Sequence, residues 1–423
     1  MNMDTHQLQS EKVASFISNL QTTSIQFPKE RIELAEKVLS QIEFPTSRSE
    51  AWKYTRVAKI ANLTLVNGNG TTSNLQYTHS AQGSIEITIE NGVVTTITGD
   101  LPVGLTIKSM HDCSAFELKE LGQLVPLENE IFSSINTLYL QDGLFIHVAA
   151  NCIVEKSIEV THHILGANQL ANFRNFIIVE KNSKASLVYN YIETEGTASF
   201  VNVVNEVMVG ENSSVYIDKL QNETDGNFHI ETDQILQNKN SNFTINTITL
   251  GGSFVRNNLS IAVAGTNCET HLNGAYVLED QQHVDNHTTV DHQMAHCVSN
   301  ELYKGIIGDK ATAVFNGKVF VRKDAQKVNA YQSNANILLS DNATVNSKPE
   351  LEIYADDVKC SHGSTTGQMD EQAIFYLRAR GLSEKSAKQL LVGAFIGDAL
   401  EKISSEKLKT EINTILLKKF GWE

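Results

Sequence analysis

The feature that most constrains this fold is a long stretch, from about residue 83 to residue 366, built almost wholly from short β-strand patterns. It opens with IEITIE from Ile85, where isoleucines alternate with polar residues, and the turn signal Asn91-Gly92 follows. Valine, isoleucine, threonine and asparagine recur, and the whole chain has only five prolines. Because an ordinary soluble domain is only about 20–25% strand, a run of this length predicts a mainly β core.

The stretch contains a weak internal repeat, which predicts how its strands are arranged. Each copy begins with an apolar residue, passes through a polar turn and places a small residue four positions on, at Cys152, Ser183, Ser213, Ala311, Ala325 and Ala343. Strand–corner–strand units that cannot bury their own apolar faces have to stack on one another. The pattern therefore predicts a degenerate, right-handed parallel β-helix (a solenoid), and an all-β sandwich is the competing interpretation.

Helical patterns flank this core on both sides. Apolar residues recur at helical spacing near the N-terminus, at Val13, Phe16, Ile17, Leu20, Ile32, Ala35, Leu39 and Ile42. We therefore divide the chain into an N-terminal helical region (1–82), a β-helix core (83–366) and a C-terminal helical region (367–423). Trp52 and Tyr54 are expected to anchor the N-terminal region on the core.

The C-terminal region is predicted to form three short amphipathic helices. Asp370 and Ser383 are expected N-caps, and Arg378, Arg380 and Gly381 form a typical helix end. The expected apolar positions are Ile374 and Leu377 in the first helix, Ala387, Leu390, Leu391, Ala394, Phe395 and Ala399 in the second, and Leu408, Ile412, Ile415 and Phe420 in the third. These helices either cap the open end of the solenoid or present a docking surface.

Charge and cysteine content exclude several classes of protein. A formal net charge of −15 argues against a surface that binds nucleic acid. The chain has no apolar run long enough to span a membrane and no signal-peptide pattern at its start, so we expect a cytoplasmic protein. Its five cysteines are scattered and contain no C-x-x-C pair, which excludes a disulfide framework and a local four-cysteine metal cluster.

Enzyme motifs are missing as well. GIIGDKAT, from Gly305, is the nearest approach to a Walker A motif, but it lacks the G-K-[ST] ending, so ATP hydrolysis by this chain is not expected. No G-x-S-x-G or G-x-G-x-x-G pattern occurs. A carbohydrate-active β-helix enzyme stays open as an alternative, although no pair of carboxylates stands out by its spacing and this alternative rests on fold analogy.

The strongest chemical signal is the pair Cys360 and His362. Side chains two residues apart project from the same face of a strand, and thiolate and imidazole are ligands that iron–sulfur and zinc sites use. Small neighbours, Ser361, Gly363 and Ser364, leave room for another chain to approach. The pair is therefore a candidate metal site, and packing of both side chains in a core is the competing interpretation.

A second group of histidines lies at His283, His287, His292 and His296, next to Cys297. On strands, His283 and His287 are expected to share one face, and His292 and His296 another. These side chains either bind metal or are hydrogen-bonded polar residues of the solenoid turns, and their spacing does not decide between the two.

Three long segments resemble the SufB/SufD family of iron–sulfur cluster assembly proteins. They are PTSRSEAWKYT from Pro45, HTTVDHQMAHCVSNELYKGIIGDKATAVFNGKVFV from His287, and IYADDVKCSHGSTTGQMDEQAIFYLRARGLS from Ile353. The match is closer to the SufD branch. The SufB version of the last segment has a cysteine where this chain has Leu377, and it lacks the C-S-H-G sequence; a SufB-like paralogue is the alternative.

The resemblance implies a scaffold and not an enzyme. It implies pairing with SufB through the end of the β-helix, and binding of the ATPase SufC by the C-terminal helices. It also implies a transient iron–sulfur cluster or iron ion, with no permanently bound cofactor, shared with SufB at His362 and, less strongly, Cys360. The partner-binding residues implied are Asp370, Phe375, Tyr376, Arg378, Arg380 and Gly381. Without SufB, a homodimer through the same unpaired edge is expected.

Overall fold

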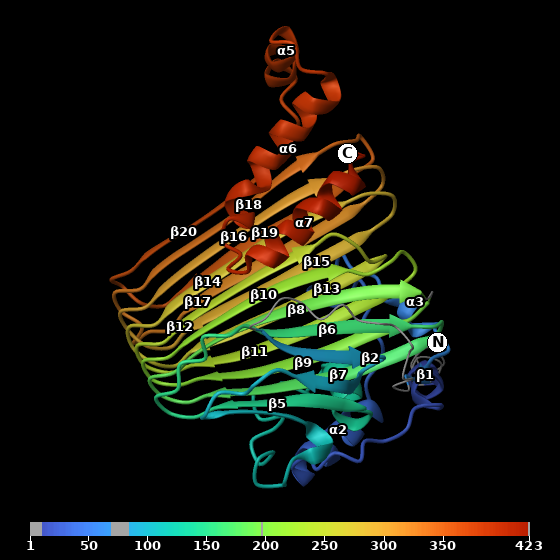
Figure 1. Ribbon diagram of the computed structural model, residues 1–423, viewed down its shortest axis with the longest axis vertical. Coiled ribbons are helices and arrows are strands. Elements are labelled where there is room, and N and C mark those ends of the chain that lie inside the picture. The colour runs from blue at the N-terminus through green and yellow to red at the C-terminus, as the bar shows by residue number, and fades with distance from the viewer. Residues whose placement is uncertain (1–10, 69–83, 196–197, 422–423) are drawn as a thin grey trace.

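The computed structural model describes residues 11–68, 84–195 and 198–421. In this part of the chain, two ten-stranded sheets lie face to face, and successive strands from β5 (Asp142–Val148) onward alternate between them. Every strand pair from β5 to β20 (Lys359–Gln368) is parallel, as Figure 1 shows. The predicted parallel solenoid is therefore confirmed, and a sandwich of antiparallel strands is excluded.

One sheet holds β4 and all odd-numbered strands except β3, and we call it the odd sheet. Its strands are β1 (Val66–Asn67), β4 (Leu105–Ser109), β5, β7 (Gln169–Val179), β9 (Phe200–Val209), β11 (Phe228–Gln237), β13 (Phe254–Val263), β15 (His283–His292), β17 (Thr312–Val321) and β19 (Thr344–Ile353). The other, the even sheet, contains β2 (Ile85–Glu90), β3 (Val93–Thr98), β6 (Ile158–Leu165), β8 (Lys184–Glu195), β10 (Ser214–Asn222), β12 (Asn242–Thr249), β14 (Glu269–Leu278), β16 (Val298–Ile307), β18 (Asn329–Leu338) and β20.

The helices lie before, between and after these strands. Residues 11–17 are helical, and the further helices and 3-10 turns are α2 (Lys29–Leu39), η1 (Glu50–Trp52), α3 (Ala58–Ala61), η2 (Met110–Asp112), α4 (Ile131–Leu138), α5 (Glu371–Ala379), α6 (Glu384–Leu400) and α7 (Glu406–Lys419). The expected boundary between residues 82 and 83 lies outside the described residues. No helix in the described ranges is long and apolar enough to cross a membrane.

The corner from the odd sheet to the even sheet is held by a ladder of asparagines. Asn151, Asn182, Asn212, Asn240 and Asn267 occupy the same place in successive turns with φ between 56° and 63°, a region that asparagine tolerates better than most residues. Each side-chain amide donates to the amide oxygen of the preceding one at 2.8–3.1 Å. Asparagine therefore suits this bend, although His296 and Lys327 occupy the corresponding place in the last two turns with φ of 63° and 61°.

The small residues of the sequence repeat follow these bends, as expected, but they do not all belong to one corner. Ser183 and Ser213 are buried directly after the asparagines, and the Ser213 hydroxyl accepts the Ser183 N–H at 3.0 Å. Ala311 and Ala343 are buried in the opposite corner, between β16 and β17 and between β18 and β19. The repeat thus mixes two corners, since both need a small side chain inside a tight bend.

Between the sheets, stacked aliphatic side chains are interrupted by a buried ionic centre. Lys219 donates to Glu231 at 2.8 Å and to Asp233 at 2.7 Å, and all three side chains are almost fully buried. His229 lies 2.5 Å from Glu223 and 3.5 Å from Glu231. Burial opposes the charge of His229, but the two carboxylates outweigh it and raise its pKa to about 9. The centre is therefore a paired network of charges.

The flanking regions cover opposite outer faces of the solenoid. The N-terminal region packs on the odd sheet, where the Arg256 guanidinium lies 3.7 Å from the centre of the Trp52 ring and pairs with Asp285. Trp52 is buried, which confirms it as an anchor, but Tyr54 is 41% exposed and that expectation is wrong. Helices α6 and α7 pack on the even sheet, and α5 projects beyond the last strands (Figure 1).

Candidate metal site and docking surfaces

The last turn of the solenoid ends in two unpaired strand edges. β20 pairs with β18 on one side, β19 pairs with β17 on one side, and neither has a partner on its other side among the described residues. Nearly all residues of β20 are exposed. Unpaired N–H and C=O groups along such edges are templates for another strand, so this end can accept a further chain.

Cys360 and His362 lie on this terminal strand and on its interior face. They align with Ala330 and Gln332 of β18, which are buried between the sheets. Cys360 is half-buried against the core, and burial raises the pKa of its thiol, so the thiol is protonated at neutral pH. His362 is exposed. The structure therefore places both donors on one face, with the imidazole as the accessible one.

Within the described ranges, the chain does not complete a metal site around this pair. Among the described residues, no group of three or more histidine, cysteine, aspartate or glutamate side chains has the geometry to hold a metal ion. Four-coordinate zinc and iron–sulfur irons need more protein ligands than two. A metal at this strand would thus take its remaining ligands from elsewhere.

Glu301, a buried carboxyl close to this end that the sequence did not single out, has no basic partner in the part of the chain that the structure describes. It lies on β16 and accepts hydrogen bonds from Thr288 at 2.5 Å and from Gln332 at 2.6 Å. Burial raises its pKa to about 7, and these hydrogen bonds offset only part of the effect. Glu301 is one of 49 acidic residues, and nothing in the sequence distinguishes it from the others. Only the register of the strands shows that its side chain faces inward.

Glu301→Gln is expected to stabilise the protein in a pH-dependent way. Because the pKa is raised from 4.5 to about 7, the folded state holds a proton that the unfolded state releases between these values. Stability therefore falls as pH rises across this window, by on the order of 3 kcal/mol. Glutamine cannot titrate, so the variant should match the parent near pH 4 and exceed it by that amount above pH 7.

Urea unfolding at a series of pH values measures this difference. Glu211→Gln is the control, because Glu211 is exposed at a corner and should leave the pH profile within about 0.5 kcal/mol of the parent. If the free energies of unfolding of Glu301→Gln and the parent changed with pH in parallel, Glu301 would not be a buried carboxyl that is protonated in the folded state.

The second histidine group is split between different surroundings. His283 stacks on Phe254, and His287 lies 3.0 Å from Asp285, on the face of β15 that meets the N-terminal region. His292 is buried between the sheets, bonded to Ser299, and burial lowers its pKa to about 4. His296 is exposed in the next corner. The expectation that His292 and His296 share a face is therefore wrong, because the strand ends at His292.

Helix α5 presents the predicted partner-binding residues. The Asp370 carboxylate accepts the N–H groups of Gln372 and Ala373, which confirms it as the N-cap. Phe375 is 74% exposed and Tyr376 56% exposed, and Arg380 lies over the Tyr376 ring. Gly381 ends the helix with φ of 94°, as its position predicts. α5 buries no residue, so its aromatic side chains are available to another molecule.

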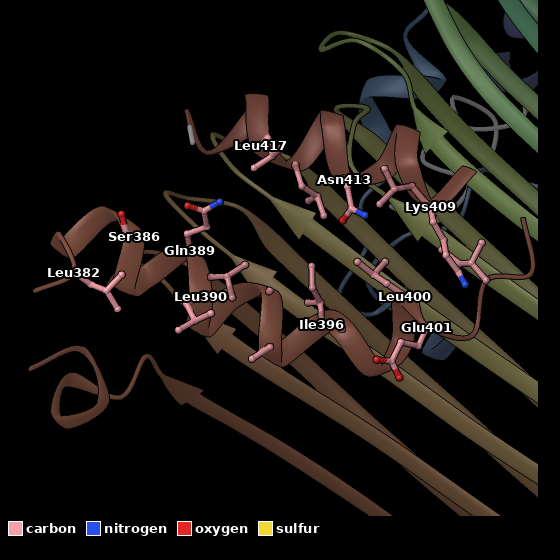
Figure 2. Close-up of a pocket in the computed structure, with 17 residues that line it drawn as sticks. Leu382, Ser386, Gln389, Leu390, Ile396, Leu400, Glu401, Lys409, Asn413 and Leu417 are labelled. Atoms are coloured by element: carbon pink, nitrogen blue, oxygen red, sulfur yellow. The ribbon is translucent and has the colours of Figure 1, made fainter. Parts of the chain in front are cut away.

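A groove between α6 and α7 is a further feature that the sequence did not reveal. It encloses about 800 Å³ and is lined mainly by apolar side chains from both helices, among them Leu390, Leu400 and Leu417, as Figure 2 shows. A side chain added at Gly393 or Gly397 would meet no atom within 4 Å. Two glycines four apart, with open space over both, let a helix approach closely; this spacing is the signal that could have revealed the groove.

The residues that α6 buries against the sheet differ from the predicted ones. Apolar side chains that were expected to be buried, such as Leu390, therefore line the groove. Ala387, Val392, Ile396 and Ala399 are buried, whereas Leu390 is 53% exposed. Of the expected stripe, only Ala387 and Ala399 are among these buried residues. In α7, Leu408 and Ile412 are buried as predicted. α6 is apolar on more than one side, so helical spacing alone did not identify the buried face.

Polar contacts fix the groove to the solenoid. Lys304 of β16 donates to the Phe395 carbonyl at 2.8 Å and pairs with Asp398 at 2.6 Å. The Asp218 carboxylate of β10 accepts from Ser404 N–H at 2.9 Å and Ser405 N–H at 3.1 Å, in the loop between α6 and α7. The groove is thus a rigid part of the even-sheet face.

Comparisons with known proteins agree with this architecture. Residues 162–395 match the family model described as SUF system FeS cluster assembly, SufBD core domain, and residues 81–160 match the SufBD protein N-terminal region. An iron–sulfur cluster assembly SufBD family protein of Synechocystis is 32% identical over 89% of this chain and 87% of its own length. The iron–sulfur cluster assembly protein SufD of Escherichia coli is 27% identical over 87% of each chain. This chain therefore belongs to the SufB/SufD family of iron–sulfur cluster assembly proteins and is SufD-like.

Proposed function

We propose that this chain is the SufD-type scaffold of a SufB–SufC–SufD complex, and that a nascent cluster or its iron is bound where the last solenoid turn meets SufB. The observation that carries the proposal is the open end itself. Two unpaired strand edges frame an exposed imidazole and a half-buried thiol that are too few to hold a metal alone. A partner that continues the sheets would place its own ligands opposite them.

The same proposal assigns the C-terminal helices to SufC. The exposed aromatic residues of α5 and the apolar groove between α6 and α7 form one helical module that follows directly from β20. ATP binding by SufC could then act on the junction through this short connection. The partner holds the nucleotide and this chain transmits the movement, so the chain acts as a scaffold without chemistry of its own.

Thr366→Pro is expected to weaken pairing with SufB. The Lys359 N–H is directed to Val328 of the neighbouring turn, and alternation along a parallel strand then directs the Thr366 N–H to the free edge. Proline removes that donor and is tolerated on edge strands. A carbonyl of SufB left unpaired costs about 1–3 kcal/mol, or roughly fivefold to a hundredfold in Kd.

Affinity capture of SufB by the tagged chain, followed by a Kd titration, measures this effect. Thr366→Val keeps the N–H and is the matched control, and it should bind as the parent does. Equal Kd values for the proline and valine variants would show that SufB does not add to this edge.

Leu390→Asp is expected to release SufC while SufB remains bound. Leu390 is exposed on the groove, and covering a carboxylate there would leave a charge in an apolar contact, which weakens binding at least about tenfold. Leu101→Asp is the control, because Leu101 is also exposed but lies between β3 and β4, outside the groove lining. Retention of SufC by Leu390→Asp in the same capture assay would place its docking site elsewhere.

A further inference from the structure

One column of interior side chains changes character over the last turns of the solenoid. The register aligns one position on each strand of the even sheet from β8 to β20, occupied in order by Leu187, Ile217, Ile245, Leu272, Glu301, Gln332 and His362. The four positions nearer the middle are aliphatic, and the last three are polar. Neighbouring strands lie about 4.8 Å apart, so each of these polar side chains is within reach of the next.

Gln332 links the other two. Its amide Nε2 donates to Glu301 on the turn before it at 2.6 Å. Its carbonyl oxygen Oε1 is buried and, among the described residues, accepts no hydrogen bond. Because Nε2 is directed to the preceding turn, Oε1 is the atom of this amide that remains for the following turn, where His362 lies. A buried carbonyl oxygen without a hydrogen bond lowers the stability of the folded state. A group that donates a hydrogen bond to this oxygen would therefore stabilise it.

A strand of the facing sheet leaves room for this amide. A side chain added at Gly317 of β17 would come within 2.1 Å of the Gln332 Nε2 atom. Gly317 faces Gln332 across the gap between the sheets, so any larger residue there would displace the amide. The Thr288 hydroxyl holds the other oxygen of Glu301, and Glu301 and Gln332 are therefore fixed from two sides.

Resting on the proposed role of His362, we propose that Gln332 is a positioning residue: the exposed His362 ring turns inward about its side-chain bonds, so that Oε1, which has no partner in the described part of the chain, accepts an imidazole N–H while Glu301 holds the amide in place. Acceptance of one ring N–H leaves the other ring nitrogen with its lone pair for a metal. Ligating histidines nearly always have such an acceptor, and its loss typically costs 10- to 100-fold in metal affinity or activity. The polar end of the column thus presets the tautomer of His362 before any metal arrives.

The contact is tested first on the full chain without metal or partner. Imidazole ¹⁵N shifts of His362, assigned by the signal that His362→Ala removes, should report one tautomer in the parent and a mixture in Gln332→Leu. Asn336→Leu is the matched control, since Asn336 is a buried amide on the same strand in another column. It should leave the His362 shifts unchanged. A single, unchanged tautomer in Gln332→Leu would overturn the proposal.

The second test is cluster formation by the complex reconstituted with SufB and SufC. Gln332→Leu should lower it by roughly 10- to 100-fold and Asn336→Leu by less than about twofold, and Gln332→Leu should add nothing in a His362→Ala background. Additive losses would show that Gln332 acts on stability and not through His362. If His362→Ala itself has no effect, the proposed metal role fails, whereas the metal-free tautomer measurement still decides the contact.

Discussion

His362→Ala is expected to lower iron–sulfur cluster formation by the reconstituted complex at least about tenfold, while leaving capture of SufB and SufC intact. Loss of a residue that only supports a ligand typically costs 10- to 100-fold, so loss of a ligand should cost no less. His362 is the exposed donor at the open end, and Cys360, beside it, is half-buried with its thiol protonated. Without the imidazole, Cys360 is a single half-buried donor at this end, and one donor does not replace two.

Cluster formation is measured by visible absorption and acid-labile sulfide after addition of iron and a sulfide source. His296→Ala is the control, because His296 is also exposed but lies at a corner between β15 and β16, away from the terminal strand. It should form clusters at the parental rate. A parental cluster yield from His362→Ala, with the complex intact, would refute the metal role and leave partner binding as the function of this end.

Lys219→Met is expected to destabilise the solenoid by about 3–5 kcal/mol. Lys219 is buried and neutralises Glu231 and Asp233, which approach it at 2.8 Å and 2.7 Å. Lys219 and His229 together hold the pKa of Glu231 well below its usual range, even though burial alone would raise it. Methionine fills a similar volume without charge, so the loss measures the uncompensated carboxylates and not a cavity.

Equilibrium urea unfolding followed by far-UV circular dichroism gives the free-energy difference. Lys184→Met, an exposed lysine on the neighbouring strand, is the control and should change stability by less than about 0.5 kcal/mol. The double variant Lys219→Met with Asp233→Asn should recover part of the loss, because it removes one of the unpaired charges. A cost below about 1 kcal/mol for Lys219→Met alone would mean that the network is not ionised as its geometry implies.

A carbohydrate-active β-helix remains a poor description of this molecule. Such an enzyme needs carboxylates along an open groove, but the pair Glu231 and Asp233 is buried between the sheets and bonded to Lys219. The groove between α6 and α7 is apolar, and a second large hollow, beside residues 42–52, belongs to the N-terminal region and not to a solenoid face. These features suit partner binding better than sugar binding.

The order of strands and corners could be predicted from the sequence because both depend on local chemistry. Alternation of apolar and polar residues defines a strand wherever one face is buried, and a small residue after a polar turn marks a corner, as Ser183 and Ser213 show. The caps at Asp370 and Ser383 were equally local, since each side chain accepts an N–H two or three residues away. The Cys360–His362 pair also follows from one strand.

What the sequence could not provide was the alignment of residues about thirty positions apart. Glu301, Gln332 and His362 form one column only because the intervening corners have the lengths they have, and a shift by one residue would turn each side chain to the other face. Similarly, packing against the even sheet determines that Val392 and Ile396 lie on the buried side of α6. The chain alone determined a stacked β core, its flanking helices and a donor pair at its end, because each arises from neighbouring residues. Tertiary structure decided what supports that pair and which helix surfaces stay open, because those depend on packing between distant segments.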